Sequence, residues 1–312
     1  MNHSAASSSS SLYQGEFSSY GVKEAPPSLI RWSGGACLRA SAFVASLRLG
    51  VILAGIFVAL LFVAAISPEL LVATDPLATN AREVFRAPSL AHPFGTDENG
   101  RDLLARLVHG VRPSLIMGLG ATLIGLGGGA LIGLLAGLGR RWIDGAIMRA
   151  LDVVLAFPDI LLALVIITFC GQGMANAIFA VGVASIPRYA RMVRAQTLVV
   201  RQSQYIEAAR TLGLHPLVIV WRHVLPNAIK PVLILATIGI GGKIAAGAAL
   251  SFLGFGAPPP APEWGSMLSV GRNFLANAWW LTAIPGVAIT LTVLSISAIG
   301  REIMRRSEGK RV

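Results

Sequence analysis

Three charged side chains interrupt stretches of sequence that are otherwise apolar. Asp152 and Asp159 lie at the start of the run Val153 to Cys170, and Lys243 lies near the middle of the run Pro231 to Gly254. At membrane depth a charge costs at least about 2.5–3.5 kcal/mol, so each group is expected to face protein or water. Because the two aspartates are seven positions apart, the spacing predicts that they share one face of a helix that Pro158 bends.

These charges allow two interpretations. They can line a wet path through the membrane, with Asp152 or Asp159 pairing with Lys243 or meeting an amino group of a solute. They can instead be structural, as a buried ion pair or as an aspartate at a helix end near the inner headgroups. For Asp152 the structural interpretation is the simpler one.

The sequence carries no motif for covalent, metal or nucleotide catalysis. H-E-x-x-H, G-x-S-x-G and G-x-x-x-x-G-K-[ST] are all absent, and the histidines are scattered over different segments. The D-x-N-G sequence that begins at Asp97 lacks the remaining ligands of a calcium loop. Cys37 and Cys170 lie in dissimilar segments, which predicts no disulfide framework. We therefore expect no catalytic residue, metal site or cofactor in this chain.

Composition places these residues in an all-α integral membrane protein. The 312 residues are 54% hydrophobic and 13% charged, whereas soluble domains are about 25% charged, and the mean hydropathy is +0.68. Apolar runs of roughly 20 residues can cross the bilayer as helices. About six such spans are predicted, at residues 47–66, 114–138, 153–170, 175–193, 231–254 and 280–300. The fourth is the weakest, because Pro187 and several arginines end its apolar part.

Basic residues predict the orientation of these spans. Lysine and arginine concentrate before residue 47, at residues 139–149 and 188–230, and after residue 300, while segments 67–113 and 255–279 hold fewer. By the positive-inside rule, both termini are cytoplasmic. The net charge of +11 then reflects topology, and nucleic acid is not an expected partner. Trp264, Trp279 and Trp280 are predicted in an outer aromatic belt, and Trp142 in an inner one.

The chain divides into five predicted regions. Residues 1–46 are a Ser-rich cytoplasmic tail expected to be disordered, although a mitochondrial transit peptide is a competing interpretation. Residues 47–66 form an uncleaved anchor, and residues 67–113 an outer segment with a short helix that Asn99 caps and Gly110 ends. Residues 114–300 are the transmembrane core, and residues 301–312 a basic cytoplasmic tail.

The second predicted span contains glycine at every fourth position. The residues are Gly125, Gly129, Gly133 and Gly137. This spacing removes side chains from one helix face and predicts close packing against a neighbouring helix. A glycine-lined pore is the alternative interpretation.

A charged segment, residues 203–227, separates the fourth and fifth predicted spans. Its first part, "QYIEAARTLGL", predicts a helix with Ile206, Ala209 and Leu212 on one face that stops at Gly213. The second part, "PLVIVWRHVL", predicts a helix that starts at Pro216 and ends before Pro226. Together they predict a cytoplasmic helical hairpin.

The hairpin has the composition of a contact surface. Ala208 and Ala209 would leave a flat spot, with an apolar rim of Leu217, Val220 and Trp221. Such a patch is typical of a partner site. The alternative is an amphipathic hairpin that lies on the inner leaflet with its arginines at the headgroups.

Several short sequence motifs together resemble those of a known family. The hairpin has Glu-Ala-Ala, three residues, Gly, and then Leu-Pro, which resembles the cytoplasmic signature of permease subunits of binding-protein-dependent ABC importers. The words "HPFGTDENGRDLLARL", "RALDVVLAFPDILLAL", "SIPRYARMVRAQTL", "RHVLPN", "LSFLGFGAPPPAPEWGSML" and "AWWLTAIPGVAITLTVL" are similar to the dipeptide, oligopeptide and nickel branch. Within that branch they resemble the second of the two permease subunits. The resemblance covers residues 90–300.

The resemblance implies a transport subunit of the bacterial inner membrane that is not itself an enzyme. In that family the hairpin contains a coupling helix that docks on a separate ATPase subunit. The matching residues here are Glu207, Ala208, Ala209, Gly213, Leu225 and Pro226. His223 stands where the wider superfamily usually has Ile. The implied partners are membrane lipid, a second permease, an outer solute-binding protein and two ATP-binding subunits that hold ATP and Mg.

Two alternatives to a peptide permease follow from the same residues. A nickel or other small-solute permease of the same branch would share all the words quoted above. An ion-coupled secondary transporter would use Asp152 and Asp159 as binding groups, but it predicts inverted repeats that the sequence lacks.

Overall fold

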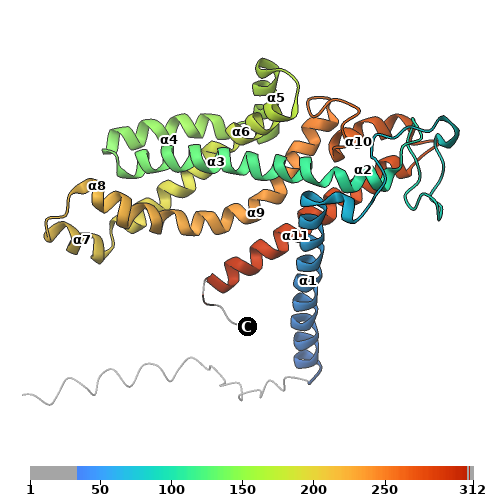
Figure 1. Ribbon diagram of the computed structural model, residues 1–312. Coiled ribbons are helices and arrows are strands. Elements are labelled where there is room, and N and C mark those ends of the chain that lie inside the picture. The colour runs from blue at the N-terminus through green and yellow to red at the C-terminus, as the bar shows by residue number, and fades with distance from the viewer. Residues whose placement is uncertain (1–33, 308, 310–312) are drawn as a thin grey trace, which may run out of the picture. The chain divides into compact units, whose positions relative to one another are not determined.

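The computed structural model describes residues 34–307 and residue 309, and Figure 1 shows the order of their helices. The α-helices are α1 Gly34–Ile66, α2 Leu103–His109, α3 Val111–Leu138, α4 Arg141–Leu155, α5 Asp159–Cys170, α6 Met174–Arg201, α7 Gln204–Thr211, α8 Pro216–Ile219, α9 Leu225–Phe252, α10 Trp264–Gly271 and α11 Trp280–Ser307. Short 3₁₀ helices occur at Pro68–Leu70, Ala81–Glu83 and Arg272–Phe274, and a π-helical turn at Val220–Val224. Apart from one bridge between Thr96 and Asp102, no β-structure occurs in this range. Most of the Ser-rich tail, residues 1–33, lies outside the described residues.

Four helical stretches within the described range are long and apolar enough to cross a membrane. They are Leu49–Ile66, Leu103–Leu138, Pro216–Phe252 and Trp280–Ser307. Helices α4 and α5 together give a fifth candidate if they are one broken span. The all-helical membrane architecture is therefore confirmed, with four or five candidate spans. Helix α6 has sufficient length, but its arginines lower its hydropathy.

The predicted third span is not one continuous helix. Helices α4 and α5 are bent by 91° at a break that contains Pro158. Proline lacks the amide hydrogen that would continue the ladder, and it disfavours the α conformation at the residue before it. Asp152 and Asp159 consequently belong to different helices. The prediction that they share one helix face is wrong.

Helices α3 and α6 form the closest helix pair of the bundle, and they run side by side in Figure 1. All four glycines of the ridge at residues 125, 129, 133 and 137 lie against α6. A Cβ atom at Gly133 would lie 2.5 Å from the carbonyl oxygen of Ala190, and one at Gly137 would lie 2.7 Å from the Cβ of Thr197. The two backbones approach so closely that any side chain at these positions would have to displace α6.

The outer segment differs from its prediction at the start of its helix. Asp102, not Asn99, caps α2, and its carboxylate accepts from the amide of Ala105 at 2.8 Å. Asn99 instead belongs to a tight turn, in which its amide donates to the carboxylate of Asp97 and Gly100 has a φ of +70°. Local side-chain bonds to the backbone compete with helix formation at this point.

Two of the predicted belt tryptophans are core residues. Trp264 is 1% exposed and Trp280 is 5% exposed. Their indole nitrogens donate to the carbonyl oxygens of Leu107 and Thr96, at 2.9 and 3.1 Å. These bonds attach α10 and α11 to the outer segment. The two indole rings can be buried because their N–H groups are hydrogen-bonded. Trp279 and Trp142 are exposed, as a belt position requires.

Candidate functional site

The hairpin at residues 203–227 packs through an apolar core of its own. Ile206 and Ala209 of α7 are buried together with Ile219 of α8, Val224 of the π-helical turn and neighbouring residues of α6 and α9. Leu138, at the end of α3, also packs against this cluster. Gly213 closes α7 with a φ of +76°, which glycine adopts without steric cost. The hairpin is therefore anchored to three helices of the bundle.

The two alanines of the motif lie on different faces of α7. Ala208 is exposed beside Glu207, whereas Ala209 is 6% exposed and belongs to the hairpin core. Leu212 was predicted on the same face as Ile206 and Ala209, but it is among the exposed residues. The predicted flat spot of two alanines is wrong, because a helix turns by about 100° between adjacent residues.

The hairpin exposes several large apolar side chains. Its exposed large side chains, which we call the hairpin patch, are Tyr205, Leu212, Leu217, Val218 and Trp221, and Trp221 is 69% exposed. Of the predicted rim, Leu217 and Trp221 belong to this patch, while Val220 is half-buried. Sequence reasoning missed Tyr205 and Val218. Large exposed apolar side chains gathered on one short segment are typical of a contact with another protein or with a membrane.

The second arm of the hairpin continues into α9 without a stop. The predicted end before Pro226 is wrong, because the π-helical turn at Val220–Val224 leads directly into α9 and places Pro226 in its first turn. Proline has no amide hydrogen, so the hydrogen-bond ladder lacks one bond at Pro226, directly after the π-helical turn. The Asn227 side chain donates to the carbonyl oxygen of His223 at 2.7 Å. Leu225 is half-buried at the junction.

Polar contacts attach the hairpin region to the glycine ridge. The Arg201 guanidinium, at the end of α6, donates to the carbonyl oxygen of Gly137 at 2.8 Å. Beside it is a recess of about 440 Å³, which Glu207 and Arg210 line together with Leu198, Arg201, Gln202 and Ser203. A displacement of α7 would thus be transmitted directly to both α3 and α6.

Three arginines of α6 pair with three aspartates of the broken span. Arg194 binds Asp144 through two hydrogen bonds of 2.6 Å. Arg191 pairs with Asp152, and Arg188 pairs with Asp159 at 3.0 Å. We call these six residues the arginine ladder. The arginines recur at every third position, and each aspartate comes from the segment that packs beside it.

The ladder corrects the predicted role of the two aspartates. Neither Asp152 nor Asp159 forms a salt bridge with Lys243, because each is within reach of an α6 arginine instead. The signal that could have revealed this is the spacing Arg-x-x-Arg-x-x-Arg at residues 188–194. In the sequence, these arginines indicated only the orientation of the chain and the end of the apolar part of the fourth span.

A cavity of about 340 Å³ lies between α5, α6 and α9. Asp159 and Arg188 line it with Tyr189, Lys243 and a mostly apolar remainder. Asp152 is not among the lining residues. A Cβ atom at Gly239 would lie 2.7 Å from the Tyr189 hydroxyl, so this glycine makes room for the phenol on the cavity wall.

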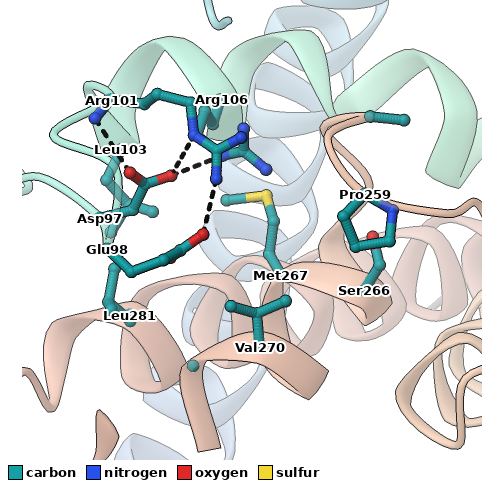
Figure 2. A pocket seen from close by; sticks show the side chains of 12 residues that line it. Asp97, Glu98, Arg101, Leu103, Arg106, Pro259, Ser266, Met267, Val270 and Leu281 are labelled. Atoms are coloured by element: carbon teal, nitrogen blue, oxygen red, sulfur yellow. Dashed lines mark hydrogen bonds and ion pairs between the residues drawn. The ribbon is translucent and has the colours of Figure 1, made fainter. Parts of the chain in front are cut away.

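A second charged cluster stabilises the outer segment (Figure 2). The Arg101 guanidinium donates to Asp97 and Glu98, both at 2.6 Å, and Arg106 approaches Asp97 at 3.5 Å. Arg106 also donates to the carbonyl oxygen of Pro260 at 3.2 Å. These groups are largely buried and mutually paired. They join residues 97–106 to the loop before α10. The sequence motifs of the two segments did not predict this contact.

The amino-acid sequence matches a family described as the binding-protein-dependent transport system inner membrane component, over residues 129–310. The match includes α4 to α11, and thus the hairpin, the arginine ladder and the cavity. The chain belongs to this family of inner-membrane transport proteins.

Similar proteins point to one branch of the family. The chain is 42% identical over 236 residues to a dipeptide transport system permease of Alkalihalophilus pseudofirmus, covering 76% of this chain and 78% of the relative. It is 43% identical over 250 residues to a glutathione transport system permease of Pectobacterium atrosepticum, covering 79% and 82%. It is 43% identical over 207 residues to a di/tripeptide permease of Pseudomonas aeruginosa, covering 66% and 68%.

Solved structures support the fold. An inward-facing methionine ABC transporter has a TM-score of 0.53 at 24% identity, covering 64% of this chain and 95% of that chain. An amino acid ABC transporter has a TM-score of 0.50 at 19% identity, covering 64% and 94%.

The family assignment confirms the resemblance to the second permease subunit of the dipeptide, oligopeptide and nickel branch. The chain is a multi-pass permease subunit of the inner membrane, and ATP is bound by separate subunits. A binding-protein-dependent ABC system also implies a solute-binding protein as a partner.

Proposed function

We propose that this permease imports di- or oligopeptides across the bacterial cytoplasmic membrane, driven by ATP hydrolysis on partner subunits. The names of the relatives support a peptide substrate, since they are dipeptide, di/tripeptide and glutathione permeases. The complex would contain a second homologous permease, two ATP-binding subunits and an outer solute-binding protein.

The proposed topology has six spans with both termini in the cytoplasm. Helix α6 supplies the span that hydropathy alone misses, because the arginine ladder neutralises its charges against α4 and α5. Cysteine labelling tests this arrangement. In a background with Cys37→Ser and Cys170→Ser, which removes the exposed native thiol of Cys170, a membrane-impermeant maleimide is expected to label Leu90→Cys in intact cells, and to label Leu217→Cys only after the membrane is opened. Equal labelling of the two cysteines in intact cells would refute the proposed topology.

The proposed coupling contact is the hairpin patch together with Glu207 and Ala208. The single observation that carries it is the connectivity: the hairpin joins α6 to α9, and these two helices line the cavity. An ATPase subunit that holds the hairpin differently in its two nucleotide states would therefore move two walls of the cavity. Only such a difference in contact free energy can shift the bundle between conformations.

The proposed roles of the motif residues follow from their burial. Glu207 and Ala208 contact the ATPase, Ala209 fills the hairpin core, and Gly213 provides the turn. Leu225 and Pro226 transmit displacement into α9. Asp159 and Lys243 line the proposed path with Arg188 and Tyr189, whereas Asp152 is a structural partner of Arg191.

Replacing one residue of the patch tests the contact. Leu217→Asp is expected to abolish co-purification of the ATPase subunits and uptake, because a carboxylate would be desolvated in an apolar interface. Leu90→Asp is the matched control, since Leu90 is also exposed but belongs to the outer segment. It is expected to retain both.

The alternative position of the hairpin, flat on the inner leaflet, predicts a different result. In that arrangement Leu217→Asp would weaken membrane contact but leave the ATPase subunits bound. Retained co-purification would therefore overturn the proposed contact. Ala208→Trp serves as a second variant, since the added bulk lies outside the hairpin core. Ala209→Trp is unsuitable because it would disrupt that core.

A further inference from the structure

The cavity between α5, α6 and α9 contains an unbalanced positive charge. Its charged lining residues are Asp159, Arg188 and Lys243. Arg188 and Asp159 pair at 3.0 Å and neutralise each other. Lys243 is 8% exposed and forms no salt bridge within the described residues. The cavity wall therefore has one surplus cation.

A largely buried lysine without a salt bridge in a membrane protein requires a physical explanation. Burial of the side chain reduces the hydration of its ammonium group, and the cost is recovered only when an anion or several hydrogen-bond acceptors approach it. The rest of the lining is mostly apolar, including Leu235, Ala246 and Leu250, and its hydroxyl groups on Ser185 and Tyr189 carry no charge. The nearby carboxylate of Asp159 is already held by Arg188. The site thus lacks an anion. A transported solute could provide one.

We propose that Lys243 binds a carboxylate of the transported solute, and that this carboxylate is the C-terminal group of a peptide. The inference rests on the proposed function, because it assigns the substrate class to the same path. The cavity volume of about 340 Å³ lies within the usual range of small-molecule sites. The Tyr189 hydroxyl on the cavity wall adds a group that can donate to the same carboxylate.

A carboxylate would reach Lys243 only while the path is open to solute. Binding replaces the lost hydration of both ions by one charge-assisted hydrogen bond. The arrangement therefore matches a solute whose acidic end lies at α9 and leaves the Arg188–Asp159 pair intact.

The experiment uses the complete complex reconstituted with its binding protein. Uptake of dialanine and of dialanine amide is measured for the wild type, Lys243→Met and Lys243→Arg, together with ATP hydrolysis. The ratio of acid to amide uptake is calculated for each protein. Dividing the wild-type ratio by the variant ratio cancels the selectivity of the binding protein, which is the same in both.

The quotient for Lys243→Met is expected to be about tenfold, the contribution of one charge-assisted hydrogen bond. For Lys243→Arg, which keeps the charge, it is expected to stay near one. Lys230→Met is the matched control, because Lys230 is an exposed lysine of α9 outside the cavity. It is expected to give a quotient near one. ATP hydrolysis stimulated by the binding protein should persist in all variants.

Several results would overturn the inference. A quotient near one for Lys243→Met, with uptake intact, would overturn the inference but not the proposed peptide function. Loss of the second permease from Lys243→Met, restored in Lys243→Arg, would show that a carboxylate of that subunit pairs with Lys243. If the wild type imports neither compound, the proposed peptide function fails and the inference fails with it.

Discussion

Replacing Gly133 by alanine is expected to destabilise the pair of helices α3 and α6. The added Cβ atom would lie 2.5 Å from the carbonyl oxygen of Ala190, whereas ordinary contacts begin at 3.4 Å. The difference, 3.4 minus 2.5, is 0.9 Å. Because the obstructing atom belongs to the backbone of α6, no rotamer change can relieve the clash. The helices must separate or tilt.

Overpacking of this kind costs about 1–3 kcal/mol. For a domain of this size the corresponding decrease in Tm is about 2–6 °C. Gly127→Ala is the matched control, since it makes the same substitution in the same helix and its Cβ would meet nothing within 4 Å. Thermal unfolding of the purified complex, followed by loss of the monodisperse gel-filtration peak, measures both variants.

The functional consequence provides a second measurement. Helix α6 lines the cavity and ends at the hairpin, so a displacement near Gly133 is expected to reduce uptake per ATP hydrolysed. If Gly133→Ala has the Tm and the uptake of Gly127→Ala, then α3 and α6 are not in tight backbone contact. The role of the glycine ridge in helix packing would then be refuted.

Two further substitutions test the ion pairs. Arg106→Met is expected to destabilise the outer segment by about 1–2 kcal/mol, because the carbonyl oxygen of Pro260 and the carboxylate of Asp97 each lose a contact while Asp97 keeps Arg101, and to accelerate proteolysis of residues 67–102. Arg86→Met should change nothing, since its pair with Glu83 is long and exposed; equal cleavage rates would contradict the assignment. Asp144→Asn is expected to lower stability by about 1–3 kcal/mol, because it weakens a bidentate, partly buried pair. An unchanged Tm would show that this rung of the ladder is dispensable.

The hairpin shows which structural features a sequence pattern can predict and which it cannot. The punctuation by Gly213 and Pro216 predicted two short helices, and both are present, because backbone conformation at these residues is decided locally. The exposure of Ala208 and the burial of Ala209 depend on how α7 rotates against α3, α6 and α9. That rotation depends on distant partners, which a pattern of adjacent residues cannot specify. The continuation through Pro226 required a π-helical turn that also depends on its packing.

The sequence by itself determined that the chain is a helical membrane protein, because composition and run length decide whether a segment is stable in hydrocarbon. It also determined the glycine repeat and the family, since these are properties of residue order. Tertiary structure decided which charges meet. Asp159 could pair with Lys243 or with Arg188, and only the 91° bend between α4 and α5 beside α6 brings it to the arginine, so that no carboxylate of the described residues forms a salt bridge with Lys243. Electrostatic pairing depends on distance in space, and residue order fixes that distance only after the helices have packed.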